Sequence, residues 1–302
     1  MREDWVNTGR EMSRFLDTLH SGRALLMDGA MGTELIRAGL PPGKCGELWN
    51  LTHPEQVGAI HQAYVEAGAE ILLTNTFQAN PATLARYGLD GQLVAIHCRA
   101  ATLARTAAGL DRFVLADVGP IQRDTSGEEF TDRSLLRRSI RSLEGDGILL
   151  ETCSTPRVRW AVKTLAPYEN ARPVLLSLTY QRDPAGKLAT RSGHAPEWFA
   201  RRAKAYGVAA LGVNCGRDIG MDDIIDIIRR YRAATDLPLF ARPNAGTPTK
   251  QGDRWIYPQT PEAMAARLPE LLEAGASMIG GCCGTTPAHI AAFRTVIDAW
   301  KK

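Results

Sequence analysis

Short apolar segments alternate with longer segments of helical periodicity from about residue 24 to the end of the chain. Most of the short segments are continuously apolar, which is typical of strands buried on both faces. The segments between them repeat apolar residues every three or four positions, and several begin at Pro or Asp and end at Gly, as helices do. The predicted strands lie at 24–28, 69–76, 112–119, 147–152, 173–180, 208–215, 237–244 and 276–283.

This alternation of strand and helix predicts an α/β fold, a (β/α)₈ TIM barrel, with a doubly wound open sheet as the alternative. Residues 1–22 precede the first strand, and Met12, Phe15, Leu16 and Leu19 give them one apolar helical face. We therefore expect an N-terminal helical extension (1–22) packed on one barrel domain (23–302). The clearest predicted helices lie at 54–68, 134–145, 156–167, 195–207, 221–234, 261–275 and 286–302.

Composition and charge argue against several classes of protein. The 302 residues are 44% hydrophobic and 23% charged, and the net charge of +3 is spread without a basic tract, so we expect no nucleic-acid or membrane partner. No segment has the length of a signal peptide or a bilayer span, which predicts a cytoplasmic protein. Six cysteines are too sparse for a disulfide scaffold, and in a reducing compartment clustered cysteines favour metal binding or thiol catalysis. The oligomeric state is left open.

Polar residues recur where the predicted strands end. Because barrel enzymes build their sites at the C-terminal ends of the strands, this recurrence predicts a site on one rim. Any one of these residues could instead cap the following helix, Thr76 and Asp117 above all. The residues are Asp28, Asn75, Thr76, Asp117, Glu151, Asn214, Cys215, Asn244, Cys282 and Cys283.

The cysteines carry the sharpest signal. Cys282 and Cys283 are adjacent and flanked by glycines, so both can reach one ion only where the strand ends and the backbone turns. Cys215 ends a strand two units earlier in the barrel and could supply a third thiolate. Three thiolates leave one tetrahedral position open, as in catalytic zinc sites. The alternatives are buried apolar cysteines, as we interpret Cys45, Cys98 and Cys153, or a strained disulfide.

A zinc ion with three thiolates suits one kind of chemistry. It is a poor Lewis acid for a carbonyl, but it can bind a substrate thiol as the thiolate, which is a nucleophile at neutral pH. Such a thiolate favours attack on an activated methyl group.

The glycine-rich turn at 28–35 (DGAMGTEL) follows the first strand. It is not a GxGxxG fingerprint, and Asp28 would repel a phosphate. A turn that offers backbone amides beside carboxylates suits an amino acid. We expect the amides and Thr33 to bind its carboxylate, and Asp28 with Glu151 to bind its ammonium.

With these residues in view, the sequence resembles the homocysteine S-methyltransferase family. The likeness runs through LLMDGAMGTEL, TNTFQAN, ILLET, GVNC, ARPNAG and GGCCGTTP, over roughly residues 22–300. TNTF and GGCCGTTP are more similar to the homocysteine-binding module of cobalamin-dependent methionine synthase than to the betaine enzymes. After Glu151, Thr152 and Cys153 stand where aromatic residues would cage a quaternary ammonium.

The resemblance implies zinc on Cys215, Cys282 and Cys283, which together with Glu151 would be the catalytic residues. It also implies a pocket for the acceptor, with Asn214 and Asn244 lining its floor. The implied substrate-binding residues are Asp28, Gly29, Ala30, Met31, Gly32, Thr33, Glu151, Asn214 and Asn244.

We therefore expect a zinc-dependent S-methyltransferase that methylates homocysteine to methionine. No folate or corrinoid domain is fused, so the donor is expected to be a free sulfonium or ammonium compound, or a methyl-corrinoid on a separate protein. One alternative is a subunit of a corrinoid-dependent system acting on another thiol or methylated compound. Another is a barrel without catalysis, in which the zinc is structural or the cysteines form a redox pair.

Two loops depart from the family or stand out in length. The stretch 119–128 is only loosely similar to the family's loop. The loop 246–262 carries Lys250, Arg254, Trp255 and Tyr257 and could be a lid over the donor or an ordinary solvated loop. We expect the identity of the donor to depend on these regions.

Overall fold

The computed structural model describes residues 8–121, 129–130, 132–165, 172–183, 185–216, 218–252 and 254–300. Of the two loops singled out by the sequence, 119–128 lies outside these residues from 122 onward, whereas 246–262 is described except for Asp253. Among the helices of these ranges, none has both the length and the apolar character needed to cross a membrane.

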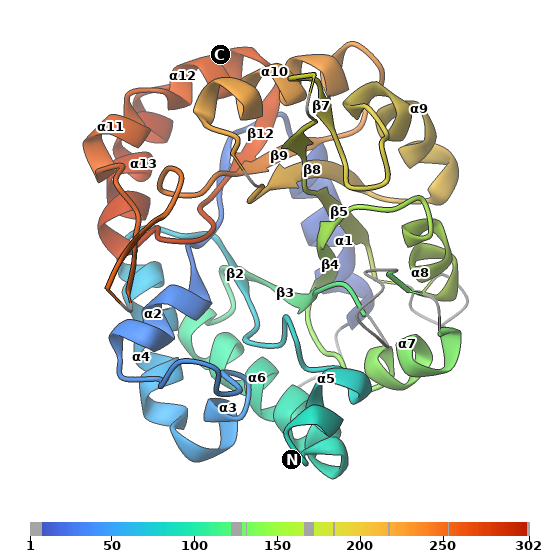
Figure 1. Ribbon diagram of the computed structural model, residues 1–302, viewed down its shortest axis with the longest axis vertical. Helices are drawn as coiled ribbons and strands as arrows, with labels where there is room; N and C mark the ends of the chain where they lie inside the picture. The colour runs from blue at the N-terminus through green and yellow to red at the C-terminus, as the bar shows by residue number, and fades with distance from the viewer. Residues whose placement is uncertain are drawn as a thin grey trace.

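Within the described residues, eight parallel strands form one sheet in the order β1-β12-β9-β8-β5-β4-β3-β2. A parallel bridge between Met27 and Ile71 joins the two end strands, so the sheet closes into a barrel (Figure 1). The predicted TIM barrel is confirmed over the open sheet, and each strand starts within its predicted segment. The strands are β1 (Leu25–Leu26), β2 (Ile71–Leu73), β3 (Phe113–Val118), β4 (Gly147–Cys153), β5 (Val174–Leu178), β8 (Ala210–Asn214), β9 (Leu239–Arg242) and β12 (Ala276–Ile279).

Helices surround the barrel (Figure 1). Several start at a proline, whose missing N–H costs nothing in the first turn. Two predicted helix boundaries are wrong. The predicted helix 134–145 ends at residue 140. The segment 261–275 forms two helices, because Pro269 cannot donate to the carbonyl four residues earlier. The helices are α1 (Thr8–His20), α2 (Met31–Arg37), α3 (Trp49–Thr52), α4 (Pro54–Glu66), α5 (Pro81–Arg86), α6 (Leu93–Ala108), α7 (Arg133–Ile140), α8 (Val158–Leu165), α9 (Pro196–Tyr206), α10 (Met221–Arg232), α11 (Pro261–Ala265), α12 (Leu268–Glu273) and α13 (Pro287–Ala299), with a 3₁₀ turn η1 (Asp90–Gln92).

Helix α1 covers the end of the barrel where the strands begin. Phe15 and Leu19 are buried together with the side chains that fill the barrel interior. The ring of Phe15 lies 4.9 Å from that of Phe113, the first residue of β3. The opposite end, where the strands finish, is therefore the end left for a site. The division into an extension (1–22) and a barrel domain (23–302) stays a prediction.

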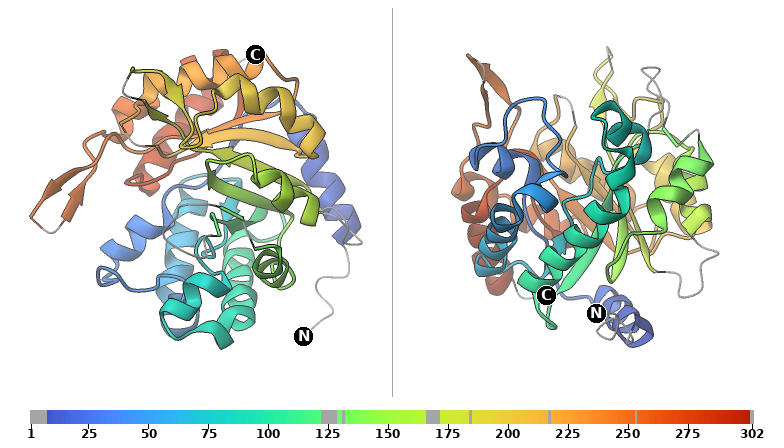
Figure 2. Two further views of the ribbon diagram at one scale, coloured as in Figure 1. Left: turned by 45° about the vertical axis from the view of Figure 1, so that its right-hand side comes forward. Right: turned by 90° about the horizontal axis from the view of Figure 1, so that it is seen from below.

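Two short hairpins decorate that opposite end. Strands β6 (Gln181–Arg182) and β7 (Leu188–Ala189) form one, and β10 (Thr249–Gln251) and β11 (Arg254–Ile256) form the other. Figure 2 shows the β10–β11 hairpin standing out from the barrel. The loop 246–262, which the sequence left as a lid or a solvated loop, is thus an ordered hairpin at the rim.

A buried histidine in α4 predicts how the fold responds to acid. His61 is fully buried, and within the described part of the chain neither ring nitrogen has a hydrogen-bond partner. Burial lowers the pKa of His61 to about 4 because it disfavours the charged ring. The unfolded chain takes up this proton near pH 6.5, so the stabilisation by neutral His61 is complete above that pH and is lost as the pH falls towards 4.

We expect the wild-type protein to lose about 2 kcal/mol of unfolding free energy through His61 between pH 7.5 and pH 5. His61→Leu should abolish that part of the pH dependence. Urea unfolding of both proteins at the two pH values measures the difference. Equal pH dependence in the two proteins would show that His61 is not held neutral by the fold.

Candidate active site

The three predicted cysteines converge at the C-terminal ends of β8 and β12. The sulfur atoms of Cys215, Cys282 and Cys283 all lie within 4.8 Å of one another. The sulfurs of Cys282 and Cys283 are 3.9 Å apart. Tetrahedral zinc with bonds of about 2.3 Å separates its thiolates by about 3.8 Å. Among the described residues, these three cysteines form the group of potential ligands that lie close enough together to hold one metal ion.

Strand β9, which lies between β8 and β12, holds the two cysteine turns together through its backbone. The N–H of Cys215 donates to the carbonyl of Arg242 (3.3 Å), and the N–H of Cys282 donates to that of Pro243 (2.8 Å). The N–H of Ala245 donates in turn to the carbonyl of Cys283 (2.9 Å). The relative position of the sulfurs therefore follows from ordinary hydrogen bonds at the end of one strand.

The glycines around the cysteines allow this close packing. Gly284 has a φ of +82°, and a side chain there would collide with the ring of Tyr257. A Cβ on Gly280 would lie 2.7 Å from the carbonyl oxygen of Asp28. Cys215 itself has a φ of +53°, which is uncommon outside glycine and occurs where surrounding structure holds the backbone.

The thiols of the cluster are chemically suited to a cation. The pKa of Cys215 falls to about 3 because the thiols of Cys282 and Cys283 donate to its sulfur. The same contacts raise the pKa of Cys282 to about 11, and that of Cys283 further. Without a cation the cluster thus favours one thiolate over three. A soft divalent metal such as zinc fits this donor set and would stabilise all three as thiolates.

An arginine that sequence reasoning did not single out joins the two predicted ammonium-binding carboxylates. Arg242, at the end of β9, is 3% exposed and pairs with both Asp28 (3.1 Å) and Glu151. The second oxygen of Asp28 accepts from the N–H of Leu73 (2.7 Å). Burial raises the pKa of Asp28 and of Glu151 to about 7, against the opposing effect of Arg242. The ARPNAG motif could have indicated Arg242, because a residue at the C-terminal end of a barrel strand lies at the same rim as the other predicted site residues.

Asp117 is the other acid at this rim, and the sequence left it open as a site residue or a helix cap. It is 6% exposed, and one carboxyl oxygen has no hydrogen-bond partner among the described residues. Its pKa lies well above the usual range, first because of burial and then because of nearby Glu151. An unsatisfied carboxyl oxygen in a pocket is a feature that a bound ligand could complete.

The two asparagines that the resemblance places on the pocket floor lie against the cysteine cluster. Asn214 is fully buried and lies behind the cluster. Its amide donates to the hydroxyl of Thr152 (2.8 Å) and to the sulfur of Cys282 (3.7 Å), and its oxygen accepts from Ser177 (2.6 Å). Asn244 donates to the sulfur of Cys215 (3.6 Å). Both side chains orient the cysteines, and their contact with substrate stays a prediction.

The glycine-rich turn at 29–33 leads into α2 and is fastened to the cysteine turn. The hydroxyl of Thr285 accepts from the N–H of Ala30 (3.1 Å), and that of Thr33 accepts from the N–H of Gly284 (3.2 Å). Tyr64 donates to the carbonyl of Ala30 (2.8 Å). The N–H of Ala30 is therefore engaged, whereas the first turn of α2 leaves amides without intrahelical partners. The hydroxyl of Thr33 keeps its own proton to donate.

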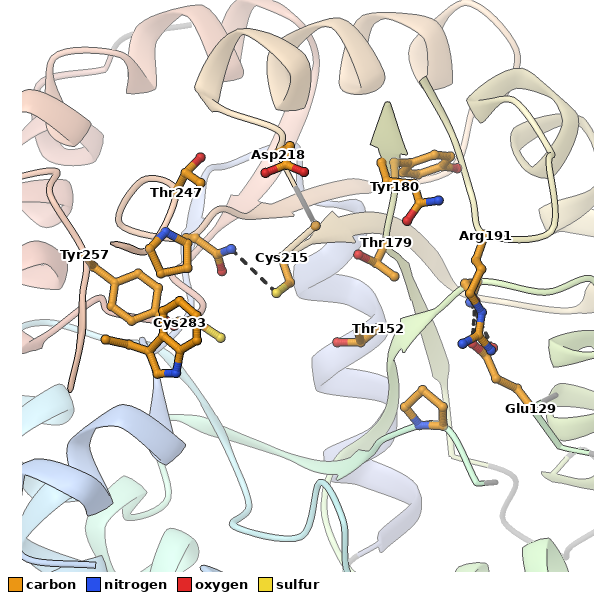
Figure 3. Close-up of a pocket in the computed structure, with 17 residues that line it drawn as sticks. Glu129, Thr152, Thr179, Tyr180, Arg191, Cys215, Asp218, Thr247, Tyr257 and Cys283 are labelled. Carbon is orange, nitrogen blue, oxygen red and sulfur yellow. Dashed lines mark hydrogen bonds between the residues drawn. The ribbon is translucent and has the colours of Figure 1, made fainter. Parts of the chain in front are cut away.

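Two cavities meet at the sulfur cluster. The first, of about 460 Å³, is lined by the 28–33 turn, Asp117, Glu151, Arg242 and all three cysteines. The second, of about 620 Å³, is lined by the ends of β4, β5 and β8 and by the β10–β11 hairpin. The lining residues common to both are Thr152, Cys215 and Cys283. Figure 3 shows Cys215 and Cys283 in the second cavity, between Tyr257 and Thr152.

The other three cysteines lie outside the sulfur cluster. Cys153 is completely buried in the main hydrophobic core and lines neither cavity. Cys45 is buried, donates to Glu47 (3.4 Å) and lines the first cavity away from the sulfur cluster. Cys98 lies on α6, outside both cavities. Cys45 and Cys153 are buried as predicted, whereas Cys98 is only partly buried.

Comparison with known proteins decides the family. The family model described as homocysteine S-methyltransferase matches residues 25–297. The chain belongs to the homocysteine S-methyltransferase family. It is a methyltransferase, and its barrel is the fold of that family.

Solved and curated proteins agree with this family. The crystal structure of the homocysteine methyltransferase MmuM from Escherichia coli, in metallated form, superposes with a TM-score of 0.74 and 28% identity, covering 94% of this chain and 99% of that one. The methionine synthase of Mycobacterium tuberculosis is 31% identical over 91% of this chain. That of Mycobacterium leprae is 29% identical over 96%. This methyltransferase chain spans about a quarter of the length of these two relatives.

Proposed function

We propose that this methyltransferase transfers a methyl group to the thiolate of homocysteine, giving methionine, and that Cys215, Cys282 and Cys283 hold the zinc ion on which the reaction depends. The observation that carries the proposal is three cysteine sulfurs within 4.8 Å, at the wall of a pocket edged by carboxyl groups. When bound, zinc would coordinate the acceptor's sulfur and keep it as the thiolate. The likeness to a metallated homocysteine methyltransferase supports this assignment.

The pocket offers separate places for the two charges of an amino acid. We assign the carboxylate of homocysteine to the amides of Met31, Gly32 and Thr33 and to the hydroxyl of Thr33. A ligand placed there has its sulfur end towards Cys282 and Cys283, which line the same pocket. Holding the thiolate and the amino-acid part together removes the freedom that a productive attack would otherwise have to overcome.

The ammonium of homocysteine would lie among the acids of the rim. Asp28 and Glu151 share one guanidinium, so the two carboxylates and Arg242 together carry one negative charge when both acids are ionised. An arriving ammonium balances that charge. Asp117 has an unpartnered carboxyl oxygen in the same pocket, and we add it to the ammonium site.

Asp117→Asn tests this addition. The amide keeps the shape of the side chain but loses the charge that would pair with the ammonium. We expect the KM for homocysteine to rise roughly ten- to hundredfold, since a hydrogen bond to a charged group is worth about 1.5–3 kcal/mol. The exposed Asp236→Asn is the matched control and should leave that KM unchanged. An unchanged KM in Asp117→Asn would remove Asp117 from the acceptor site.

We propose that the donor is a sulfonium or ammonium compound or a methyl-corrinoid on a separate protein. The experiment that tests the function as a whole is a panel of these donors with zinc-loaded protein and homocysteine as acceptor. Methionine should form, and it should cease to form when the metal is removed by a chelator and return when zinc is restored. Full activity of the metal-free protein would end the proposal.

A further inference from the structure

The flank of the barrel formed by α7 and α8 carries a surface of basic side chains. The two helices pack side by side, and α9 lies next to α8 (Figure 1). Neither α7 nor α8 contains an acidic residue, and their exposed charged side chains are all positive. We define the basic face as six exposed basic side chains of this flank: Arg133, Arg137, Arg141, Arg159, Lys163 and Arg202.

We propose that the basic face binds an acidic segment of another protein, a helix that presents carboxylates along one side. The inference goes beyond the proposed function and does not depend on it, because no member of the basic face lines the first or the second cavity. Helix α2, which borders the first cavity, lies across the barrel from α8 (Figure 1). A partner on this flank therefore leaves the acceptor pocket open.

The side chains of the basic face lack the acidic partners that arginines have elsewhere on the surface. Arg267 pairs with Asp222 (2.5 Å), and Arg294 pairs with Asp298 (2.6 Å). Among the ion pairs of the described residues, none involves a member of the basic face. The positive charge of this flank is therefore available to a ligand from outside.

Two tryptophans hold guanidinium groups of the basic face in place. The guanidinium of Arg133 lies 5.1 Å from the ring centre of Trp160, and that of Arg159 lies 5.9 Å from the same ring. Arg202 stacks at 4.0 Å on Trp198 and donates to its carbonyl (3.0 Å). Stacking occupies the flat side of a guanidinium and leaves N–H groups for a carboxylate. The arginines are thus oriented before a ligand arrives, which lowers the entropy cost of binding.

The basic face is continuous from α7 to α9. Arg133 of α7 and Arg159 of α8 share the ring of Trp160. Burial raises the pKa of Tyr206 on α9, and the charges of Arg202 and Arg159 oppose that rise, so both lie close to this tyrosine. The six positive charges therefore form one surface across three neighbouring helices.

The spacing of the arginines matches a helical ligand. From α7 into its C-terminal cap, arginines stand at every fourth position between residues 133 and 141. Residues four apart lie on one side of a helix, about 6 Å apart along its axis. Carboxylates at every fourth position of a partner helix have the same separation. Two helices laid alongside each other can therefore pair these charges in register.

The kinds of residue favour a protein over nucleic acid or lipid. Arginine and tryptophan are enriched among the residues that dominate protein–protein binding, whereas lysine is depleted at such interfaces. Single-stranded nucleic acid would need aromatic rings free to stack on bases, but Trp160 already faces guanidinium groups. Among the described residues, the large exposed apolar side chains all lie outside α7, α8 and α9, so this flank has none to insert into lipid.

Binding of labelled peptides to the full-length chain, measured by fluorescence anisotropy, tests the proposal. The first peptide is a helix of alanine and glutamate with glutamate at every fourth position. The second has the same composition in an order that spreads glutamate around the helix. We expect the first to bind at least about tenfold more tightly, and its binding to weaken as salt is added because exposed charges are screened.

Two double variants with equal charge separate this surface from net charge. Arg137→Gln with Arg141→Gln should weaken binding of the first peptide roughly tenfold, since each exposed ion pair contributes a few-fold. Lys187→Gln with Arg229→Gln removes the same charge from exposed positions outside the basic face and should leave binding unchanged. Methylation of homocysteine should be the same in both proteins, and urea unfolding shows whether both are folded.

Two variants of Trp160 test the stacked arginines. Trp160→Leu removes the ring that orients Arg133 and Arg159 and should weaken binding of the first peptide a few-fold. Trp160→Phe keeps an aromatic face and should recover most of that loss. A loss that is equal in the two variants would show that the ring does not order the arginines for the ligand.

Equal binding of the two peptides, equal loss in the two double variants, or no binding of either peptide would overturn the proposal. Tighter binding of a single-stranded oligouridylate, or of phosphatidylglycerol vesicles, would overturn it in favour of nucleic acid or lipid. Loss of methyl transfer with metal removal concerns the cysteine cluster alone, so the proposed function and this surface can fail independently.

Discussion

Replacing Cys283 with serine is expected to remove the metal and to lower methyl transfer at least about a hundredfold, both in the same protein. Changes in residues that merely orient a metal ligand cost 10- to 100-fold, so loss of a ligand itself should cost no less. Serine matches cysteine in shape but holds its proton at neutral pH, leaving two thiolates for the ion. Metal content by elemental analysis and methionine formation from homocysteine measure the two effects.

Cys98→Ser is the matched control, since Cys98 lies on α6 and lines neither cavity. It should keep both the metal and the activity. Urea unfolding of both variants shows whether either change disturbs the barrel. Zinc at full occupancy in Cys283→Ser, or full activity without metal, would contradict the assignment of the cluster.

Arg242→Met is expected to lower the free energy of unfolding by about 3–5 kcal/mol, the cost of removing one partner from a buried ion pair. Methionine has a similar length but no charge, so Asp28 and Glu151 would remain buried without their shared cation. Arg242 lowers the pKa of both acids, and without it burial would hold them protonated to a higher pH than about 7. Urea unfolding at pH 8, where the cost is larger than at pH 7, is the measurement.

Arg242→Lys keeps the charge and should recover part of the lost stability, though a single ammonium cannot match the two-sided contact of a guanidinium. Arg230→Met provides the control. Arg230 pairs with Glu197 (2.5 Å) at a partly exposed site on α10, where an ion pair is worth about 0–1 kcal/mol. A loss in Arg242→Met no greater than in Arg230→Met would mean that the buried pairs do not stabilise the fold.

The positions of the strands along the chain could be predicted from the sequence because most of them are unbroken apolar segments. A continuously apolar segment indicates a strand that is buried on both faces, and side-chain hydrophobicity alone is enough to recognise it. Helix α6 lacked a comparable signal, since its buried face is built largely from alanines such as Ala100, Ala101 and Ala104. Alanine differs little in hydrophobicity from the residues on the exposed face of the helix. The sequence pattern therefore showed no clear apolar face, and this helix was not among the predicted ones.

The cysteine cluster was predictable because adjacent Cys282 and Cys283 can share an ion only at a turn. The pairing of Arg242 was not, although its position at a strand end was visible. Which side chains meet across a barrel rim depends on strand order and register, here β9 opposite the ends of β1 and β4. The sequence pattern gives neither, so the carboxylates could be placed on the rim but not joined to their partner.

The hairpin β10–β11 could not be predicted from the pattern of apolar and polar residues. Among its described side chains, those of residues 249–251, Trp255 and Ile256 are exposed, so they show no buried face by which the strands could be recognised. Only the structure places Tyr257 beside Cys283 and so turns a long loop into part of a cavity wall.

The hydrogen bonds from the end of β9 to both cysteine turns have a consequence for assembly. Closure of the barrel already brings the three sulfurs close to the separation that tetrahedral coordination requires. The proposed zinc ion would therefore bind to a preformed site and would not have to order a flexible segment. The chain loses its conformational entropy when it folds, before the metal binds. The free energy of metal coordination would therefore be reduced little by any further ordering of the chain.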